Sequence, residues 1–139
     1  MFGPSLFTGS LITRYGDFKI IFVGAILGLL CIAVALSGLS VSHFWIALVL
    51  LGVSWNFMFI GGTTLLTKTY KPSETAKVQG FNDFLVFGTV ATASLSAGIL
   101  QQMFGWDVVN MSMIPFFGLV AIIALLNMGR KEPAVAPAE

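Results

Sequence analysis

The polar residues best placed to bind a small molecule are Trp55 and Asn56, in the run SWNF at the centre of a long uncharged stretch. An Asn side chain offers a substrate two donors and an acceptor, and an indole offers a flat apolar wall with one donor. Polar groups in the middle of a membrane span are costly unless partnered, so they often mark a functional interior. We predict that Trp55 and Asn56 bind substrate. The alternatives are packing by Trp55 and a hydrogen bond from Asn56 to a neighbouring helix.

A second polar group lies in the run QGFNDF, where Gln79, Asn82 and Asp83 precede another uncharged stretch. Side chains of this kind at the edge of a span can latch a gate or respond to protons. We predict that these three residues and Arg14 take part in gating or coupling. The alternative is that Asp83 is a solvated interfacial charge, paired with Arg14, Lys77 or another base.

The sequence contains no pattern typical of an enzyme or a metal site. His43 is the only His and has no Cys, Asp or Glu near it in sequence, so it lacks the partners that a metal ion or a nucleophile needs. The only Cys, Cys31, lies in an apolar run, where it is expected to be a buried small hydrophobe. There is no Gly-rich phosphate loop, and a net charge of +1 provides no basic face for nucleic acid. We expect no enzyme activity, cofactor, metal ion or nucleic-acid partner.

The composition is that of a membrane protein. The 139 residues are 57% hydrophobic and 9% charged, which leaves too few charges to cover a soluble domain. A helix needs about 20 apolar residues to cross a bilayer, and its backbone must be paired within the segment. We predict an all-α, integral membrane helical bundle that spans the lipid bilayer with four transmembrane helices, at residues 20–42, 44–66, 84–106 and 108–128.

The two ends of the chain differ from these spans. Residues 2–13 are apolar but too short to cross a bilayer, and they carry no Lys or Arg of the kind that surface helices use. We predict that they form the inner half of a transmembrane helix and complete a membrane domain over residues 1–129. Residues 130–139 are rich in Pro and Ala without periodicity, which predicts a disordered tail.

Basic residues predict the orientation of the spans. All seven Lys and Arg residues lie before the first span, between the second and third, or after the fourth. The opposite connectors, SGLSVSH and FGWDVV, contain none. Because cytoplasmic segments carry the excess of basic residues, we predict that the N-terminus, the middle connector and the C-terminal tail are cytoplasmic.

Small residues predict where helices approach one another closely. The first span carries Gly24 and Gly28 at a four-residue spacing, and the third carries Gly88, Thr92 and Ser96 at the same spacing. Small side chains at this spacing let two membrane helices pack tightly. We predict that both sets are helix-packing surfaces.

The third span also carries a polar stripe on one helical face, and the second span is polar near its centre. Because the other two spans are mostly aliphatic or aromatic, we expect the second and third spans to face protein or water and the first and fourth to face lipid. The stripe consists of Asn82, Thr89, Thr92 and Ser96.

A charged turn near the N-terminus resembles a family signature. The run GSLITRYGDFK, from Gly9 to Lys19, resembles the G-x-L-x-D-R-x-G-x-x-K cytoplasmic loop of the major facilitator superfamily, with Thr13 in place of the Asp. The runs WNFMFIGGTTLLT and ETAKVQGFNDFLVFG resemble the C-terminal part of bacterial permeases of the uncharacterised, efflux-type branch.

This resemblance implies both a fold and a mechanism. Residues 2–13 would be the end of the eighth helix and the four spans the ninth to twelfth, in a transporter of two six-helix halves that works by alternating access. The chain would be a fragment of a multi-pass secondary active transporter of the bacterial inner membrane. It would export or take up a small molecule of unknown identity, together with a missing N-terminal half or another copy of itself.

Two other interpretations stay open. One is a self-sufficient four-helix protein that dimerises like small multidrug carriers, although such carriers hold a buried acid in their first helix and no Asp or Glu occurs between Lys19 and Thr67. The other is a non-transporting membrane subunit that assembles with a partner.

Overall fold

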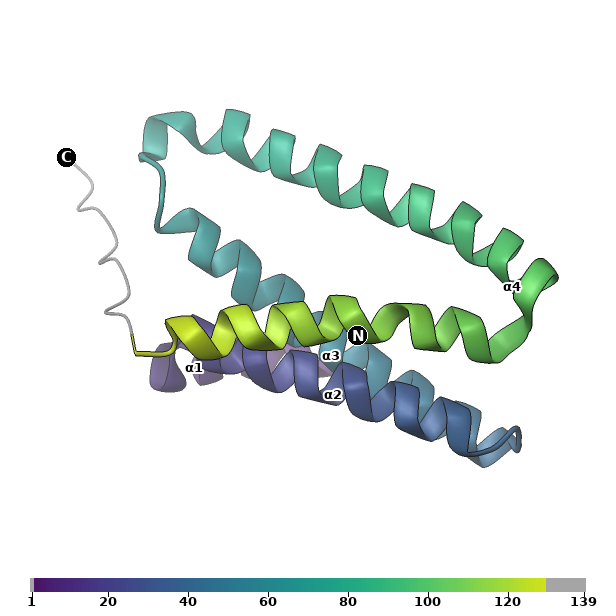
Figure 1. Cartoon of the computed structure of the whole chain (residues 1–139). Coiled ribbons are helices and arrows are strands. Elements are labelled where there is room, and N and C mark those ends of the chain that lie inside the picture. Colours follow the sequence, from purple (N-terminus) through teal and green to yellow (C-terminus); the bar gives the residue numbers. More distant parts are fainter. Residues whose placement is uncertain (1, 130–139) are drawn as a thin grey trace.

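The computed structural model describes residues 2–129, and this part of the chain is helical apart from short turns (Figure 1). Its helices are α1 (Phe2–Tyr15), α2 (Asp17–Ser37), α3 (Val41–Thr67) and α4 (Thr75–Asn127), with a short 3-10 helix, η1 (Pro72–Glu74), before α4. The prediction of an all-α membrane bundle is confirmed, because α2, α3 and α4 are each long and apolar enough to cross a membrane. The predicted tail at residues 130–139 lies outside the described residues.

The third and fourth predicted spans form one element, α4, which is broken at Gly105. Gly105 has φ 81° and ψ −179°, a conformation that glycine adopts without a steric penalty. The break divides α4 into two arms, residues 75–104 and 106–127. In Figure 1 the first arm lies apart from the other helices, and the second arm turns back to lie along α2. One residue thus makes the turn for which we predicted a short connector.

The helix α2 is the centre of the bundle and contacts α1, α3 and α4. In the most apolar window of each helix, 39% of the residues are buried in α2, against 22% in α3 and 11% in α4. Within the described chain α2 is thus the most covered of the three long helices, and which helices face lipid and which face protein stays a prediction. The coverage of α2 arises because Gly24, Ala25 and Gly28 give it a smooth face, on which its neighbours pack closely.

An aromatic cluster joins α2, α3 and the second arm of α4 near the turn between α2 and α3. The indole Nε1 of Trp106, at the start of the second arm of α4, donates to the carbonyl oxygen of Ala35 at 3.1 Å. The Trp106 ring also packs edge-on against Phe44, with 5.5 Å between centroids. Beneath it, the Cys31 thiol donates to the Ala47 carbonyl at 3.2 Å. Cys31 is therefore a buried packing residue, as the sequence predicts.

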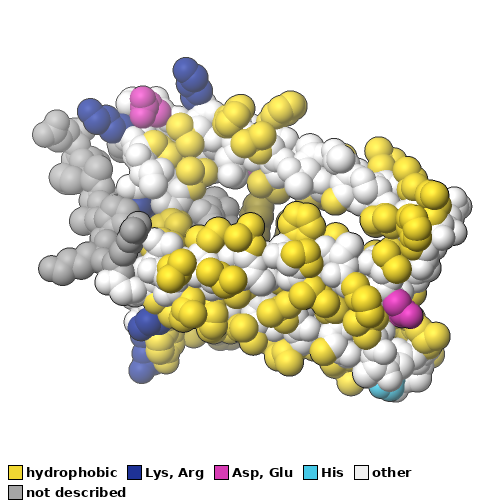
Figure 2. Space-filling view, viewed as in Figure 1, with side chains coloured by type: hydrophobic (Ala, Val, Ile, Leu, Met, Phe, Trp, Pro, Cys, Tyr) yellow, Lys and Arg dark blue, Asp and Glu magenta, His cyan; other side chains and the backbone are white. Residues whose placement is uncertain are grey.

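The basic residues gather at the opposite end of the molecule, and the single His lies at the aromatic end (Figure 2). This separation arises because each helix reverses direction, so the end of α1, the start of α2, the end of α3 and the start of α4 all meet there. It matches the charge pattern used to predict orientation, and the side of the membrane on which this end lies stays a prediction. The basic residues at this end of the described chain are Arg14, Lys19, Lys68, Lys71 and Lys77.

Candidate functional site

Two aromatic rings, those of Trp55 and Phe59, project from the middle of α3. They lie four residues apart and therefore on the same face of the helix. The rings are stacked, with centroids 6.0 Å apart and 11° between their planes. With 40% and 39% of their surfaces exposed, neither is covered by the rest of the chain. They form one wall of a cavity of about 240 Å³, and Asn82 and Val86 from the first arm of α4 form the facing wall.

A second cavity, of about 380 Å³, adjoins the first. It shares Trp55 and Val86 with the first cavity and continues along the first arm of α4 past Thr89 to Ala93. Trp55 thus lies where the two cavities meet. A continuous apolar space between two helices, with a few polar groups on its walls, is the usual form of a small-molecule site.

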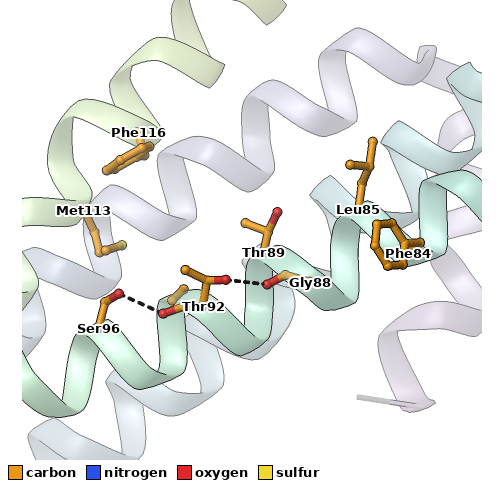
Figure 3. A pocket seen from close by; sticks show the side chains of 9 residues that line it. Phe84, Leu85, Gly88, Thr89, Thr92, Ser96, Met113 and Phe116 are labelled. Carbon is orange, nitrogen blue, oxygen red and sulfur yellow. Dashed lines mark hydrogen bonds between the residues drawn. The ribbon is translucent and has the colours of Figure 1, made fainter.

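A third cavity, of about 610 Å³, lies between the two arms of α4, where Met113 and Phe116 face Gly88, Thr92 and Ser96 (Figure 3). The Thr92 hydroxyl donates to the Gly88 carbonyl at 2.9 Å, and the Ser96 hydroxyl donates to the Thr92 carbonyl at 2.8 Å. No atom lies within 4 Å of the position that a Cβ on Gly88 would take. The predicted packing surface on this arm is thus uncovered in the described chain, and its role stays a prediction.

The polar stripe of the third span therefore divides into two parts. The hydroxyls of Thr92 and Ser96 are engaged by their own helix. In contrast, Asn82 and Thr89 make no side-chain hydrogen bond within residues 2–129, and both line the cavities beside Trp55. The indole N–H of Trp55 likewise has no partner in that range. Polar groups without a protein partner are available to a ligand.

Asn56 faces the other way, because adjacent residues on a helix point in different directions. Its side chain is 8% exposed, and its Oδ1 accepts a hydrogen bond of 2.7 Å from the Thr8 hydroxyl of α1, which is fully buried. Two residues further back, the Ser54 hydroxyl donates to the Gly24 carbonyl at 2.8 Å. The structure thus separates Trp55, at the cavity, from Asn56, at the contact with α1. A role for either residue in substrate binding stays a prediction.

We expect Thr8→Val to destabilise the chain by about 1–2 kcal/mol, because it keeps the shape of the side chain but deprives the buried Asn56 oxygen of its donor. The measurement is the free energy of unfolding of the purified chain in mixed micelles, followed by helicity during denaturant titration. The control is Thr63→Val, since the Thr63 hydroxyl bonds only the Phe59 carbonyl of its own helix. Equal effects of the two changes would show that the contact between α1 and α3 does not depend on this bond.

The structure does not bring the four predicted gating residues together. Gln79 donates from its Nε2 to the Tyr70 hydroxyl at 2.6 Å, which ties the start of α4 to the preceding loop. Asp83 and Arg14 are both exposed and belong to different helices, and Asn82 lies at the cavity described above. A shared role in gating or coupling stays a prediction.

A buried ion pair that sequence reasoning missed joins two helices at the basic end. Gly16, with φ 91°, makes the turn between α1 and α2 and places Asp17 as the first residue of α2. Asp17 is fully buried, and its Oδ2 lies 2.5 Å from the Nζ of Lys68 at the end of α3. The signal was present in the sequence, because Asp17 lies within the charged turn GSLITRYGDFK and Lys68 begins the next basic segment.

The two small residues predicted on α2 lie at its contacts with other helices. A Cβ on Gly24 would lie 2.9 Å from Cγ of Met58 and 3.1 Å from the backbone oxygen of Ser54, so α3 leaves no room for a side chain there. A Cβ on Gly28 would lie 2.2 Å from the ring of Phe117 in the second arm of α4.

Among the described residues, no group of three or more His, Cys, Asp or Glu side chains could hold a metal ion.

Comparison with known proteins gives the family. The family model of the Major Facilitator Superfamily matches residues 4–139. The chain belongs to the major facilitator superfamily. It is 47% identical to the riboflavin transporter RfnT of Brucella anthropi over 134 residues, which make up 96% of this chain and 34% of that protein. It is also 32% and 36% identical to two uncharacterised transporters of this superfamily from Bacillus subtilis, YddS and YdeG, over 81% and 74% of this chain. No solved structure matches the chain significantly.

Membership of this superfamily makes the chain part of a family of membrane transporters, in agreement with its apolar helices and with the resemblance carried by GSLITRYGDFK. The chain spans about a third of the length of the riboflavin transporter that it matches, and 26% and 24% of the other two relatives. Nothing in these matches supports the efflux-type branch that the resemblance suggested, since none of the names states a direction of transport.

Proposed function

We propose that this chain is the C-terminal part of a secondary transporter that carries riboflavin or a closely related flat heteroaromatic molecule across the bacterial inner membrane. The observation that carries the proposal is the 47% identity with a riboflavin transporter, which extends over 96% of the chain. The aromatic cavity beside Trp55 supports it, because flat ring systems bind well against flat aromatic side chains.

The chain would act as one portion of a larger carrier. In this superfamily the substrate site lies near the bilayer midplane, and one bundle rocks against the other to expose it to each side in turn. No residue of the first arm of α4 is buried in the described bundle, which fits a helix that meets further protein. The basic end would face the cytoplasm, because all the basic residues lie there or in the tail.

A chimera tests this proposal. The chain replaces the matching segment of the Brucella anthropi riboflavin transporter, and riboflavin flux is measured in vesicles by the fluorescence of the vitamin. We expect the chimera to carry riboflavin and the 139-residue chain alone to insert but carry none, because alternating access needs two bundles. A chimera that inserts and folds but carries no riboflavin would contradict the proposed substrate.

The same experiment separates the alternatives. Saturable flux from the 139-residue chain alone, together with crosslinking to a dimer, would favour the small dimeric carrier. A chimera that folds but transports nothing, and a chain that associates with another membrane protein, would favour the non-transporting subunit.

A further inference from the structure

We infer that Trp55 and Phe59 form a stacking platform for a fused heteroaromatic ring and that the Asn82 side chain pairs with the polar edge of that ring. This inference rests on the proposed function, since it assigns to residues of this chain the recognition of a riboflavin-type substrate. Both walls of the proposed site come from this chain, namely from α3 and from the first arm of α4.

The platform is already formed before any ligand binds. Trp55 and Phe59 stack with their ring planes within 11° of parallel, so each ring holds the other in place and a flat molecule can lie against the outer face of the stack without rearrangement of either side chain. Preorganised aromatic side chains with few rotatable bonds bind at low entropic cost. Both rings remain about two-fifths exposed although they lie at the middle of a membrane helix, which is where a midplane site is expected.

Glycine keeps the space beside the platform open. Gly52 and Gly62 lie three residues before Trp55 and three residues after Phe59, on the same side of α3. No atom lies within 4 Å of the position that a Cβ on either glycine would take. Gly62 also lines the cavity that Asn82 closes. The open space is therefore a consequence of small residues on α3 itself, and a larger side chain at Gly62 would fill it without disturbing a helix contact.

The polar groups at this site match the edge of a heteroaromatic ring. A primary carboxamide such as that of Asn82 presents a donor beside an acceptor, which is complementary to the N–H and C=O of an imide edge. The Trp55 indole N–H and the Thr89 hydroxyl supply two more groups without a protein partner in the described chain. No charged side chain lines either cavity. The site therefore favours a neutral ring system over a phosphorylated or otherwise ionic one.

Ligand binding to the 139-residue chain in lipid nanodiscs tests the inference. The probes are lumiflavin, which is the ring system alone, ribitol, which is the side chain alone, riboflavin, and riboflavin 5′-phosphate. Binding is followed by quenching of flavin fluorescence, because stacking on an indole quenches it. We expect lumiflavin to compete with riboflavin, ribitol to have no effect, and the phosphate to bind more weakly than riboflavin.

Variants locate the site. We expect Trp55→Leu to weaken lumiflavin binding about tenfold, the size of effect typical for loss of one stacking partner. Gly62→Leu should abolish binding by filling the cavity, and Asn82→Leu should weaken riboflavin binding while leaving its quenching intact. The control is Phe87→Leu, because Phe87 is an exposed aromatic residue of the first arm of α4 that lines neither cavity. Circular dichroism confirms that each variant retains its helicity.

The outcomes separate the inference from the proposed function. Absence of lumiflavin binding by the helical chain, or equal losses in Trp55→Leu and Phe87→Leu, would overturn the platform, whatever the chimera transports. Lumiflavin binding that depends on Trp55 and Gly62 would support the platform even if the chimera carried no riboflavin, and in that case the transported molecule would be another fused heteroaromatic compound.

Discussion

Replacing Lys68 with Met should lower the free energy of unfolding of the chain by about 3 kcal/mol, the cost typical of removing one partner from a buried ion pair. The Asp17 carboxylate is fully buried and lies 2.5 Å from the Lys68 ammonium, which is itself 15% exposed. Loss of the ammonium removes a cation from a carboxylate that is shielded from water. Because the pair joins the start of α2 to the end of α3, the basic end of the bundle should loosen first. The measurement is denaturant titration in mixed micelles.

Two further variants make this prediction specific. Lys71→Met removes an exposed Lys from the same loop, outside any ion pair in the described chain, and should have little effect. The double variant Asp17→Asn with Lys68→Met should recover much of the lost stability, since a neutral amide is less costly to bury than a carboxylate. If Lys68→Met were no more harmful than Lys71→Met, the ion pair would not stabilise the fold.

Gly24→Leu should separate α2 from α3 and cost about 3 kcal/mol or more, at the upper end of what overpacking costs. The backbone oxygen of Ser54 and the Cβ of Phe57 would both lie 3.1 Å from the new Cβ, and neither can move unless the whole helix moves. The shift would also break the 2.8 Å hydrogen bond from Ser54 to the Gly24 carbonyl. Thermal unfolding in detergent, with a cysteine crosslink between α2 and α3 as a measure of their separation, reports both effects.

The matched control for Gly24→Leu is Gly88→Leu. Nothing lies within 4 Å of the Gly88 Cβ position in this chain, so the same change there should leave the stability of the isolated chain unaltered. In the chimeric transporter Gly88→Leu should instead impair assembly if the Gly88, Thr92 and Ser96 surface packs against further protein. Equal destabilisation of the isolated chain by both changes would contradict the close packing at Gly24.

Composition and charge were enough to predict the membrane-spanning helices and the gathering of basic residues at one end. These properties depend on the average composition of long segments, so an error of a few residues in a helix boundary does not change the prediction. The predicted first span at residues 20–42, for example, falls largely within the helix Asp17–Ser37, and the second, at 44–66, falls within Val41–Thr67. The spacing of Gly24 and Gly28 likewise placed both residues on one face, where α2 meets its neighbours.

Features that depend on the path of the chain could not be predicted. Adjacency in sequence predicts one site for Trp55 and Asn56, but a helix turns them toward different neighbours: Trp55 shares a cavity with Asn82, and Asn56 bonds Thr8. The central position of α2 in the described chain also depends on contacts between distant segments, because α3 packs against Gly24 and the second arm of α4 packs against Gly28. Which spans face lipid stays a prediction.

The break at Gly105 gives the first arm of α4 the mechanics of a lever. Residues 75–104 form a straight rod of about 45 Å at about 1.5 Å per residue, joined to the rest of the bundle at one end by a single glycine. A rotation of about 5° at that pivot carries the far end of the rod through about 4 Å. At its far end, the rod is joined to the loop between α3 and α4 by the hydrogen bond between Gln79 and Tyr70. A torsional change at Gly105 would therefore also displace the loop between α3 and α4, because the rod and that loop are joined at the far end.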